Sequence, residues 1–311
     1  MKIVLPVIAR SLLDAHLPED IDVHWVASRE EAVAAIADAD IAWVDLPPHG
    51  LTREAVAAGA KLKWLFTAIA GLESLDLGAL ARRGTIVTNG AGINAIAVAE
   101  YAVMGVLVAA KRFDQVVRAQ DRRDWLEYAP GRIELFETKA LVIGYGSIGR
   151  LIGERLAGFG VAVTGVTRSG RDGTLKPDEW RAKLGDYDWV ILAAPSTDAT
   201  KTLIGEPELT AMKSTAWLVN IARGDMIDDD ALIAALTAKT IAGAVLDPTE
   251  PEPLPADHPL WDAPNAIITM HLSGRSQTKM FHRAADLFLK NLAAYRADKP
   301  MINVVDLDEG Y

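Results

Sequence analysis

The chain has 311 residues, half of them hydrophobic and 6% aromatic, and its formal net charge is −10. That length is sufficient for two domains with cores of their own. The negative charge argues against a nucleic-acid partner, because it repels phosphate backbones. The sequence has no cysteine, which excludes disulfides, thiolate catalysis and cysteine-ligated zinc. A reducing compartment is compatible with this composition, and we expect a cytoplasmic protein.

The first 90 residues alternate between short β-branched segments and segments with helical periodicity. Segment 2–8 is too short an apolar run for a signal peptide, so we interpret it as the first strand. The alternation predicts a parallel sheet covered by helices. The predicted strands are 2–8, 22–26, 41–44, 63–66 and 85–88, with helices at 29–37 and 52–58 between them.

Segment 93–110 is a long hydrophobic stretch, and a membrane span is one interpretation of it. Asn94, Glu100 and Gly105 interrupt the stretch, however, and a polar or charged side chain is costly in a bilayer. We therefore interpret the segment as a long helix buried between domains or subunits, and we expect no membrane partner.

A second series of strands and helices follows the polar stretch 115–128. Six strands with helices between them match a complete dinucleotide-binding sheet. The sequence thus predicts an α/β fold with two Rossmann-like domains, each a parallel sheet covered by helices. The predicted strands are 140–143, 161–166, 189–193, 216–220, 241–246 and 266–269, and the helices are 147–158, 177–184, 228–238 and 275–296.

A glycine-rich loop joins the first strand of this series to the next helix. Gly144 permits a tight turn, Gly146 lets a pyrophosphate approach the backbone, and Gly149 lets helix and strand pack closely. The helix N-terminus then presents free N–H groups to the phosphates. A turn without a ligand is the alternative, but the strand–loop–helix context favours a nicotinamide dinucleotide. The full loop is Gly144, Tyr145, Gly146, Ser147, Ile148 and Gly149.

The residues after the next strand indicate which dinucleotide binds. An NAD site usually has an acidic residue there, but this chain has Thr167. Arg168, Ser169 and Arg171 follow, and all three can donate to a 2′-phosphate. We therefore predict that NADP(H) is preferred, with NAD(H) possible; ordinary turn residues are the alternative interpretation.

Three later segments each carry one residue suited to keto-acid reduction. Arg223 follows a strand, where open α/β sheets place their ligands, and a guanidinium can bind a carboxylate through two hydrogen bonds. Asp247 ends the next strand, before a proline-stiffened loop that contains Glu250 and Glu252. His271 ends the last strand and is suited to donate a proton near neutral pH.

Together these segments resemble the D-isomer-specific 2-hydroxyacid dehydrogenases, and more narrowly their glyoxylate/hydroxypyruvate reductase A branch. The order and spacing of the segments make the resemblance specific. It rests on 89–101, the glycine loop, 193–197, the Arg223 segment, 250–255 and 305–311.

The resemblance implies a role for each catalytic residue. Arg223 would bind the substrate carboxylate and carbonyl, and His271 would be the acid/base. Glu252 would pair with His271 and keep it protonated; Glu250 is the rival, but the family carboxylate lies five residues after the Asp, and 252 − 247 = 5. Asp247 would hold the nicotinamide carboxamide.

The resemblance also implies where the ligands and a partner subunit bind. An active site would lie in the cleft between a flavodoxin-like substrate domain, 1–96 plus 276–311, and a dinucleotide-binding domain, 97–275. Segment 118–128 would be an arm that crosses to a second subunit of a homodimer, and we expect no metal ion. Further substrate contacts would come from Ala70, Gly71 and Leu72, and further cofactor contacts from Ala194, Pro195, Ile221 and Ala222.

Two residues depart from the family pattern. Many relatives have Val at the position of Pro248 and Pro at the position of Met270. Pro248 removes a backbone donor next to Asp247, and Met270 lacks the fixed φ angle that proline would impose beside His271. These departures bear on the positioning of Asp247 and His271.

The predicted function is NADPH-dependent reduction of a small 2-keto acid, such as glyoxylate or hydroxypyruvate, to a D-2-hydroxy acid. One alternative is a dinucleotide-sensing corepressor on the same scaffold. Another is a family oxidoreductase with a different substrate, such as formate or phosphite. A third is an amino-acid or S-adenosylhomocysteine type of dehydrogenase, which the absence of their extra domains disfavours.

Overall fold

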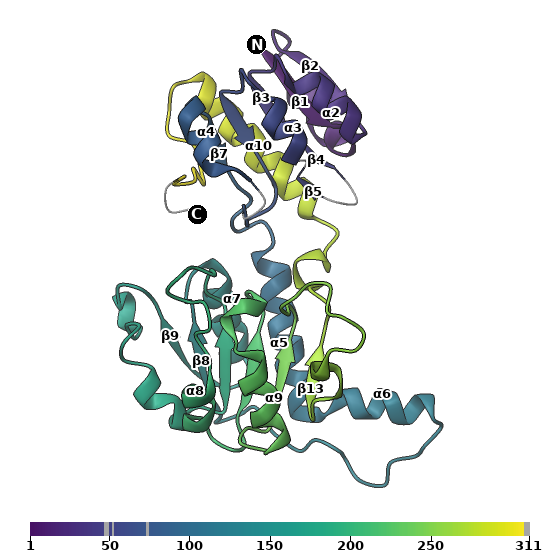
Figure 1. The fold of residues 1–311 in the computed structure, drawn as a ribbon, viewed down its shortest axis with the longest axis vertical. Helices are drawn as coiled ribbons and strands as arrows, with labels where there is room; N and C mark the ends of the chain where they lie inside the picture. Colours follow the sequence, from purple (N-terminus) through teal and green to yellow (C-terminus); the bar gives the residue numbers. More distant parts are fainter. Residues whose placement is uncertain (47–49, 52, 73–74, 308–311) are drawn as a thin grey trace. The chain divides into compact units, whose positions relative to one another are not determined.

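The computed structural model describes residues 1–46, 50–51, 53–72 and 75–307. The chain divides into two compact units (Figure 1). The first comprises Met1–Asn94 together with Gln277–Tyr311, and the second comprises Ala95–Ser276. The first unit is therefore discontinuous in sequence. Residues 308–311, at the end of the segment that contributed to the family resemblance, lie outside the described residues.

The first unit contains a five-stranded parallel sheet in the order β2-β1-β3-β6-β7. This is the flavodoxin-like order, in which strands are added first on one side of β1, as β2, and then on its other side, beginning with β3. The central strands are continuous apolar runs because helices cover both faces. The strands are β1 (Lys2–Pro6), β2 (Asp22–Val26), β3 (Ile41–Trp43), β6 (Trp64–Phe66) and β7 (Ile86–Thr88), with a small antiparallel pair β4 (Asp45–Leu46) and β5 (Gly50–Leu51).

The C-terminal helix α10 (Met280–Arg296) packs into the core of this first unit. The Phe288 ring stacks on Trp64, with ring centroids 5.2 Å apart, and lies 5.8 Å from Trp43. Such aromatic burial accounts for the return of the chain to the first unit. The remaining helices of the unit are α1 (Arg10–Leu13), α2 (Arg29–Ile36), α3 (Arg53–Ala58) and α4 (Leu77–Arg83), with short 3₁₀ segments at Val7–Ala9 and Asp14–His16.

The second unit contains a six-stranded parallel sheet in the order β13-β12-β11-β10-β8-β9. Leu175 forms an isolated parallel bridge with Val166, beyond the edge strand β9. Strands are added first on one side of β8, as β9, and then on its other side, beginning with β10. Doubly wound sheets bind ligands at the point where the strand order reverses in this way, here between β8 and β10. The strands are β8 (Lys139–Ile143), β9 (Ala162–Val166), β10 (Trp189–Leu192), β11 (Trp217–Asn220), β12 (Gly243–Leu246) and β13 (Ala266–Ile268).

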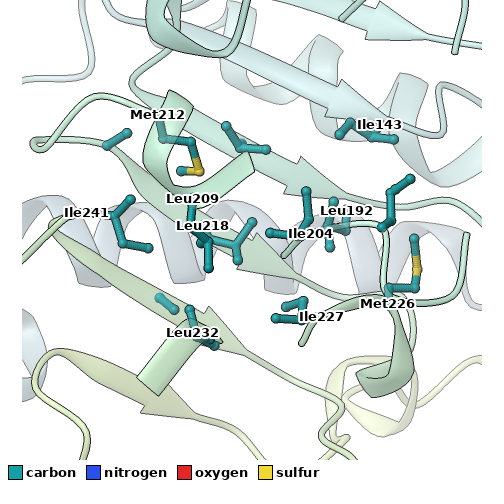
Figure 2. Close-up of a cluster of buried hydrophobic side chains, with 14 of the residues drawn as sticks. Ile143, Leu192, Ile204, Leu209, Met212, Leu218, Met226, Ile227, Leu232 and Ile241 are labelled. Atoms are coloured by element: carbon teal, nitrogen blue, oxygen red, sulfur yellow. The ribbon is translucent and has the colours of Figure 1, made fainter. Parts of the chain in front are cut away.

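Helices cover both faces of this sheet, so neighbouring strand residues enter different cores. Leu218 packs on one side with the cluster shown in Figure 2, and Val219 packs on the other side. The first core includes residues of α8 (Glu206–Ala211) and α9 (Asp229–Thr237), and the second includes residues of α5 (Ala95–Lys111) and α7 (Ser147–Ala157). The other segments are α6 (Phe113–Asp121), η3 (Arg171–Gly173), η4 (Arg181–Asp186), η5 (Gly224–Met226), η6 (Pro259–Asp262) and η7 (Ser273–Arg275).

The parallel sheets expected from the sequence are confirmed, but two predicted helices differ. Segment 177–184 is not an α-helix, because a turn is followed by the 3₁₀ segment η4. The last helix begins at Met280 rather than 275, since residues 273–275 form η7 against Asp247. Among the described residues, no helix has the length and hydrophobicity needed to cross a membrane.

Candidate active site

The glycine loop after β8 has the geometry that its sequence predicts. Gly144 has φ +97°, and a Cβ there would lie 2.3 Å from the backbone nitrogen of Ala194. A Cβ on Gly149 would lie 2.2 Å from the carbonyl oxygen of Gly144, whereas a Cβ on Gly146 would meet no atom within 4 Å. The loop is therefore closed against its own sheet and open at Gly146.

Helix α7 begins at Ser147, directly after this opening, and no described side chain caps its N-terminus. The first-turn N–H groups of a helix lack intrahelical acceptors and form a site for anions. The open backbone at Gly146 and the uncapped helix end therefore fit the pyrophosphate of a dinucleotide.

Tyr145 contributes to this loop through packing and backbone contacts. The N–H groups of Gly144 and Tyr145 both donate to the carbonyl oxygen of Val166, at 3.1 Å and 2.9 Å. A Cβ on Gly153 would lie 2.3 Å from the Tyr145 hydroxyl, and a Cβ on Gly165 would lie 2.3 Å from the Tyr145 ring. The ring thus fills the space between α7 and β9.

The loop after β9 is built around the Thr167 hydroxyl. This oxygen lies 2.7 Å from the hydroxyl of Thr174 and accepts from the N–H of Gly170 at 3.1 Å. Arg168, Ser169 and Arg171, the remaining residues expected at this end of the cofactor, are exposed on the loop. The Thr167 hydroxyl therefore holds the turn that carries the arginines.

Arg150 is a cation at this end of the site that sequence reasoning missed. It lies on the first turn of α7, with its guanidinium 5.6 Å from the centroid of the Tyr145 ring. The same group forms an ion pair of 3.1 Å with Asp172 in η3. The pair connects α7 to the loop after β9, and no local sequence pattern predicts it.

The turn that carries Arg223 follows β11 and is held by Asn220. The buried Asn220 side chain donates to the carbonyl oxygen of Arg223 at 2.7 Å and accepts from the N–H of Ala222 at 3.0 Å. Ile221 and Ala222, predicted at the cofactor, are both buried. The Arg223 guanidinium donates to the carbonyl oxygen of Ala222 at 2.8 Å.

Close backbone contacts bring this turn to two neighbouring loops. A Cβ on Gly224 would lie 2.1 Å from the carbonyl carbon of Thr249, so only glycine permits this approach. Ser196, next to the predicted cofactor residues Ala194 and Pro195, donates to the Asp225 carboxylate at 2.8 Å. The loops after β10, β11 and β12 therefore meet at the carboxyl edge of the sheet.

Asp247 directly follows β12 and holds the segment that carries His271. Its carboxylate is 1% exposed and accepts from the Thr269 hydroxyl at 2.8 Å and the N–H of Leu272 at 2.9 Å. The N–H of Ser273 also donates to this carboxylate, at 3.1 Å. Both oxygens of Asp247 therefore bind the backbone or side chains of segment 269–273.

His271 and Glu252 are in direct contact. The His271 Nδ1 atom lies 2.8 Å from the Glu252 Oε2 atom, and both side chains are about 40% exposed (40% and 38%). The second oxygen of Glu252 accepts from the N–H of Thr249 at 3.1 Å. A carboxylate at Nδ1 fixes the ring orientation and leaves Nε2 to exchange a proton with a ligand. Of the two candidates, Glu252 is the carboxylate in contact with His271.

Ala70, Gly71 and Leu72 lie in the first unit, in the loop after β6. The Asn89 side chain donates to the carbonyl oxygen of Ala70 at 2.9 Å, and the N–H of Gly90 donates to the carbonyl oxygen of Ile69 at 3.1 Å. Leu72 is buried in the core of the unit. This loop is thus held in place by the segment after β7.

The comparisons with known proteins agree with this arrangement. The family model for the NAD-binding domain of D-isomer specific 2-hydroxyacid dehydrogenases matches residues 103–273. A glyoxylate reductase from Thermofilum pendens is 33% identical, with 88% of this chain and 85% of that protein covered. The chain belongs to the D-isomer specific 2-hydroxyacid dehydrogenase family.

Two further relatives of this dehydrogenase support the same assignment. The human glyoxylate reductase/hydroxypyruvate reductase is 31% identical, with 79% of this chain and 77% of that protein covered. The solved structure of a D-isomer specific 2-hydroxyacid dehydrogenase family protein from Aeromonas salmonicida has a TM-score of 0.88 and 30% identity, with 99% of each chain covered. The family resemblance seen in the sequence is confirmed, and the protein is an oxidoreductase that uses a nicotinamide dinucleotide.

Sequence reasoning missed three residues that support the predicted ones. Asn220, Asn89 and Asp45 are buried polar side chains that hold the backbone of the Arg223 turn and of segment 67–72. Each follows directly after an apolar strand or lies at its end, and that position was the available signal. Their partners are distant in sequence in two of the three cases, so the spacing of residues could not identify them.

Proposed function

We propose that this dehydrogenase reduces small 2-keto acids to D-2-hydroxy acids, with glyoxylate and hydroxypyruvate as the first substrates to test. The contact between Glu252 and His271 carries the proposal. Reduction of a ketone creates an alkoxide that must be protonated, and an imidazole held by a carboxylate is suited to supply that proton. The named relatives that reduce glyoxylate or hydroxypyruvate support the same substrate class.

In this proposal His271 holds the transferred proton at Nε2, while Glu252 binds Nδ1 and stabilises the imidazolium. Arg223 binds the substrate carboxylate and polarises the carbonyl, since a planar guanidinium matches a carboxylate through paired hydrogen bonds. The backbone of Ala70, Gly71 and Leu72 receives the same carboxylate. The bound reduced nicotinamide supplies the hydride.

We also propose that the dinucleotide is held by the glycine loop and by the backbone around Ala194, Pro195, Ile221 and Ala222. Asp247 accepts from Leu272 and Ser273, so we assign it a positioning role for the His271 segment besides the predicted contact with the carboxamide. NADPH is the proposed preference, supported by Thr167 in place of an acid and by the exposed Arg168, Ser169 and Arg171.

A homodimer is the proposed assembly. Val103, Met104 and Leu107 of α5 line a groove of about 530 Å³ together with Phe113 and Phe159. Trp125 is 95% exposed in the segment after α6, which extends away from the sheet of the second unit (Figure 1). A contiguous apolar surface marks an interaction site, and a second copy of the chain that covers the groove would bury its apolar side chains.

A kinetic assay tests the proposed function. Purified protein is mixed with a panel of 2-keto acids and with NADPH or NADH, and the configuration of the product is determined. Turnover of glyoxylate or hydroxypyruvate to a D-2-hydroxy acid, where the product is chiral, supports the proposal. His271→Ala should lower kcat by about 10²–10⁴-fold, whereas His16→Ala, at an exposed histidine in η2, should not. Absence of turnover with every 2-keto acid would overturn it.

A further inference from the structure

Asp45 is a buried carboxylate that the proposed reaction does not use. It lies in β4 and is 5% exposed. One oxygen, Oδ2, accepts from the Trp43 indole N–H at 2.9 Å and from the N–H of Ala68 at 2.6 Å. The other oxygen, Oδ1, accepts from the Thr67 hydroxyl at 2.8 Å. All of these partners belong to β3 or to the segment that follows β6.

The partners of Asp45 lie directly before the loop of Ala70, Gly71 and Leu72. The Thr67 hydroxyl donates to Asp45 and accepts from the N–H of Ile69 at 3.1 Å. Asp45 therefore holds the amides of residues 68 and 69, one directly and one through Thr67. Buried carboxylates that accept several hydrogen bonds constrain the groups around them strongly.

The other side of the same segment is held by the residues after β7. A Cβ on Gly90 would lie 1.9 Å from the carbonyl oxygen of Ala68, and Asn89 binds the carbonyl oxygen of Ala70. Asp45 thus accepts hydrogen bonds from groups of this segment, while the Asn89 side chain and the Gly90 N–H donate hydrogen bonds to its carbonyl oxygens. These two sets of contacts hold the backbone of residues 67–70, from which the rest of the loop at 70–72 continues.

We propose that Asp45 is a positioning residue for substrate binding, because it sets the backbone of residues 67–69 and so the direction of the loop at 70–72. This inference rests on the proposed function, in which that loop receives the carboxylate of a small 2-keto acid. Asp45 itself touches neither substrate nor cofactor in this proposal, and its effect is on substrate affinity.

The hydrogen-bond pattern shows which replacement should be tolerated. An asparagine amide oxygen at the Oδ2 position would accept from Trp43 and Ala68, and its NH₂ group would donate to the Thr67 hydroxyl. Asparagine can therefore keep all three contacts, whereas alanine keeps none. Burial raises the pKa of Asp45 to about 6, so the neutral carboxyl that asparagine mimics is accessible near physiological pH.

Steady-state kinetics of Asp45→Ala and Asp45→Asn with glyoxylate and NADPH test the proposal. We expect Asp45→Ala to raise the KM for glyoxylate by about tenfold or more, because misplaced substrate-binding groups lose affinity. Its kcat and its KM for NADPH should stay within about threefold of the parent. Asp45→Asn should restore the KM for glyoxylate. Asp40→Asn, at the amino-terminal side of β3, is the matched control.

Three results would overturn the proposal. They are an unchanged KM for glyoxylate in Asp45→Ala, a parallel rise in the KM for NADPH, and a KM in Asp45→Asn as high as in Asp45→Ala. If Asp45→Ala does not fold, Thr67→Val takes its place, because it removes the hydroxyl that relays the contact to Ile69. A raised KM for glyoxylate in Thr67→Val supports the proposal, and an unchanged one overturns it.

Failure of the proposed function gives a different result. In that case the parent protein reduces no 2-keto acid, and the positioning role is decided by backbone hydrogen exchange. The amides of residues 68–72 should exchange faster in Asp45→Ala, or in Thr67→Val if Asp45→Ala does not fold, than in Asp45→Asn. Equal exchange in the two variants compared would overturn it.

Discussion

The backbone N–H of His271 donates a 2.7 Å hydrogen bond to the carbonyl oxygen of Asp247, although the two residues follow different strands. The Asp247 carboxylate holds Leu272 and Ser273 on the other side of His271. Met270 and His271 have φ angles of +57° and +54°, which cost energy for residues other than glycine. The contacts of Asp247 keep this conformation in place.

The first prediction concerns the contact between Glu252 and His271. Glu252→Gln keeps the hydrogen bond to Nδ1 but removes the negative charge that stabilises an imidazolium. We expect kcat/KM for glyoxylate to fall by about 10–100-fold, the effect of turning a charge-assisted hydrogen bond into a neutral one. Glu250→Gln is the control, because Glu252 is the residue in contact with His271. A larger loss in the Glu250 variant would reverse the assignment.

The second prediction concerns Met270, the residue directly before His271. Proline cannot adopt a φ of +57°, so Met270→Pro should displace His271 and lower kcat by about 100-fold or more. Met270→Gly should retain activity, because glycine adopts this conformation freely and the Met270 side chain is 62% exposed. Parental activity in the proline variant would mean that the working enzyme has a different backbone at this position.

The third prediction concerns the choice of cofactor. Thr167→Asp places a negative charge beside the site that we propose for the 2′-phosphate, and it can still accept from the N–H of Gly170. The ratio of kcat/KM with NADPH to that with NADH should fall by roughly 100-fold. Thr167→Asn, which adds no charge, should change the ratio much less. A parent enzyme that prefers NADH would contradict the proposal before any variant is made.

The fourth prediction concerns stability against pH. Burial raises the pKa of Asp45 from 3.8 to about 6, so the folded protein binds more protons than the unfolded chain between these values. Protonation of Asp45 therefore stabilises the folded state relative to its stability at high pH. This stabilisation is complete below pH ~4 and is lost as the pH rises through ~6, and it changes the free energy of unfolding by about 3 kcal/mol in total. Melting curves should show that Asp45→Asn becomes more stable relative to the parent as the pH rises.

Asp40 provides a control of opposite sign for this experiment. Its hydrogen bond with Lys63 holds the pKa of Asp40 below the usual value. The contribution of Asp40 is therefore present above its ordinary pKa and is lost as the pH falls. Asp40→Asn should lose stability relative to the parent at neutral pH. A pH-independent difference between Asp45→Asn and the parent would contradict the raised pKa of Asp45.

The fifth prediction concerns the assembly. The parent should have a mass near twice 33.5 kDa in light scattering, and Met104→Glu should have the mass of one chain. A charge among the apolar side chains of the groove on α5 would lose its hydration in the dimer, which is costly. Val7→Glu, at an exposed apolar residue of the first unit, should leave the mass unchanged. A monomeric parent would rule out the proposed dimer.

Local patterns determined a large part of this protein. The central strands of both sheets were predictable because parallel strands covered on both faces are continuous apolar runs, such as Leu141 to Ile143. The glycine loop was predictable because its glycines allow a local backbone conformation or a close backbone contact that other residues do not. The structure of segment 177–184 was not predictable, because a turn followed by a 3₁₀ segment, rather than an α-helix, places its apolar residues in the core.

The positions of Arg223, Glu252 and His271 were also inferred from the sequence, since each follows a strand or lies in the loop after one, and the carboxyl ends of parallel strands meet at one edge. The family resemblance already favoured Glu252 over Glu250, and the structure has Glu252 in contact with His271. Only the tertiary structure decided that Asp247 holds the His271 segment and that Asp45 holds residues 67–69. These contacts join residues from different loops, and their geometry depends on how the strands pack. The reason is that the chain determines which groups are available locally, whereas packing determines which of them come within hydrogen-bond distance.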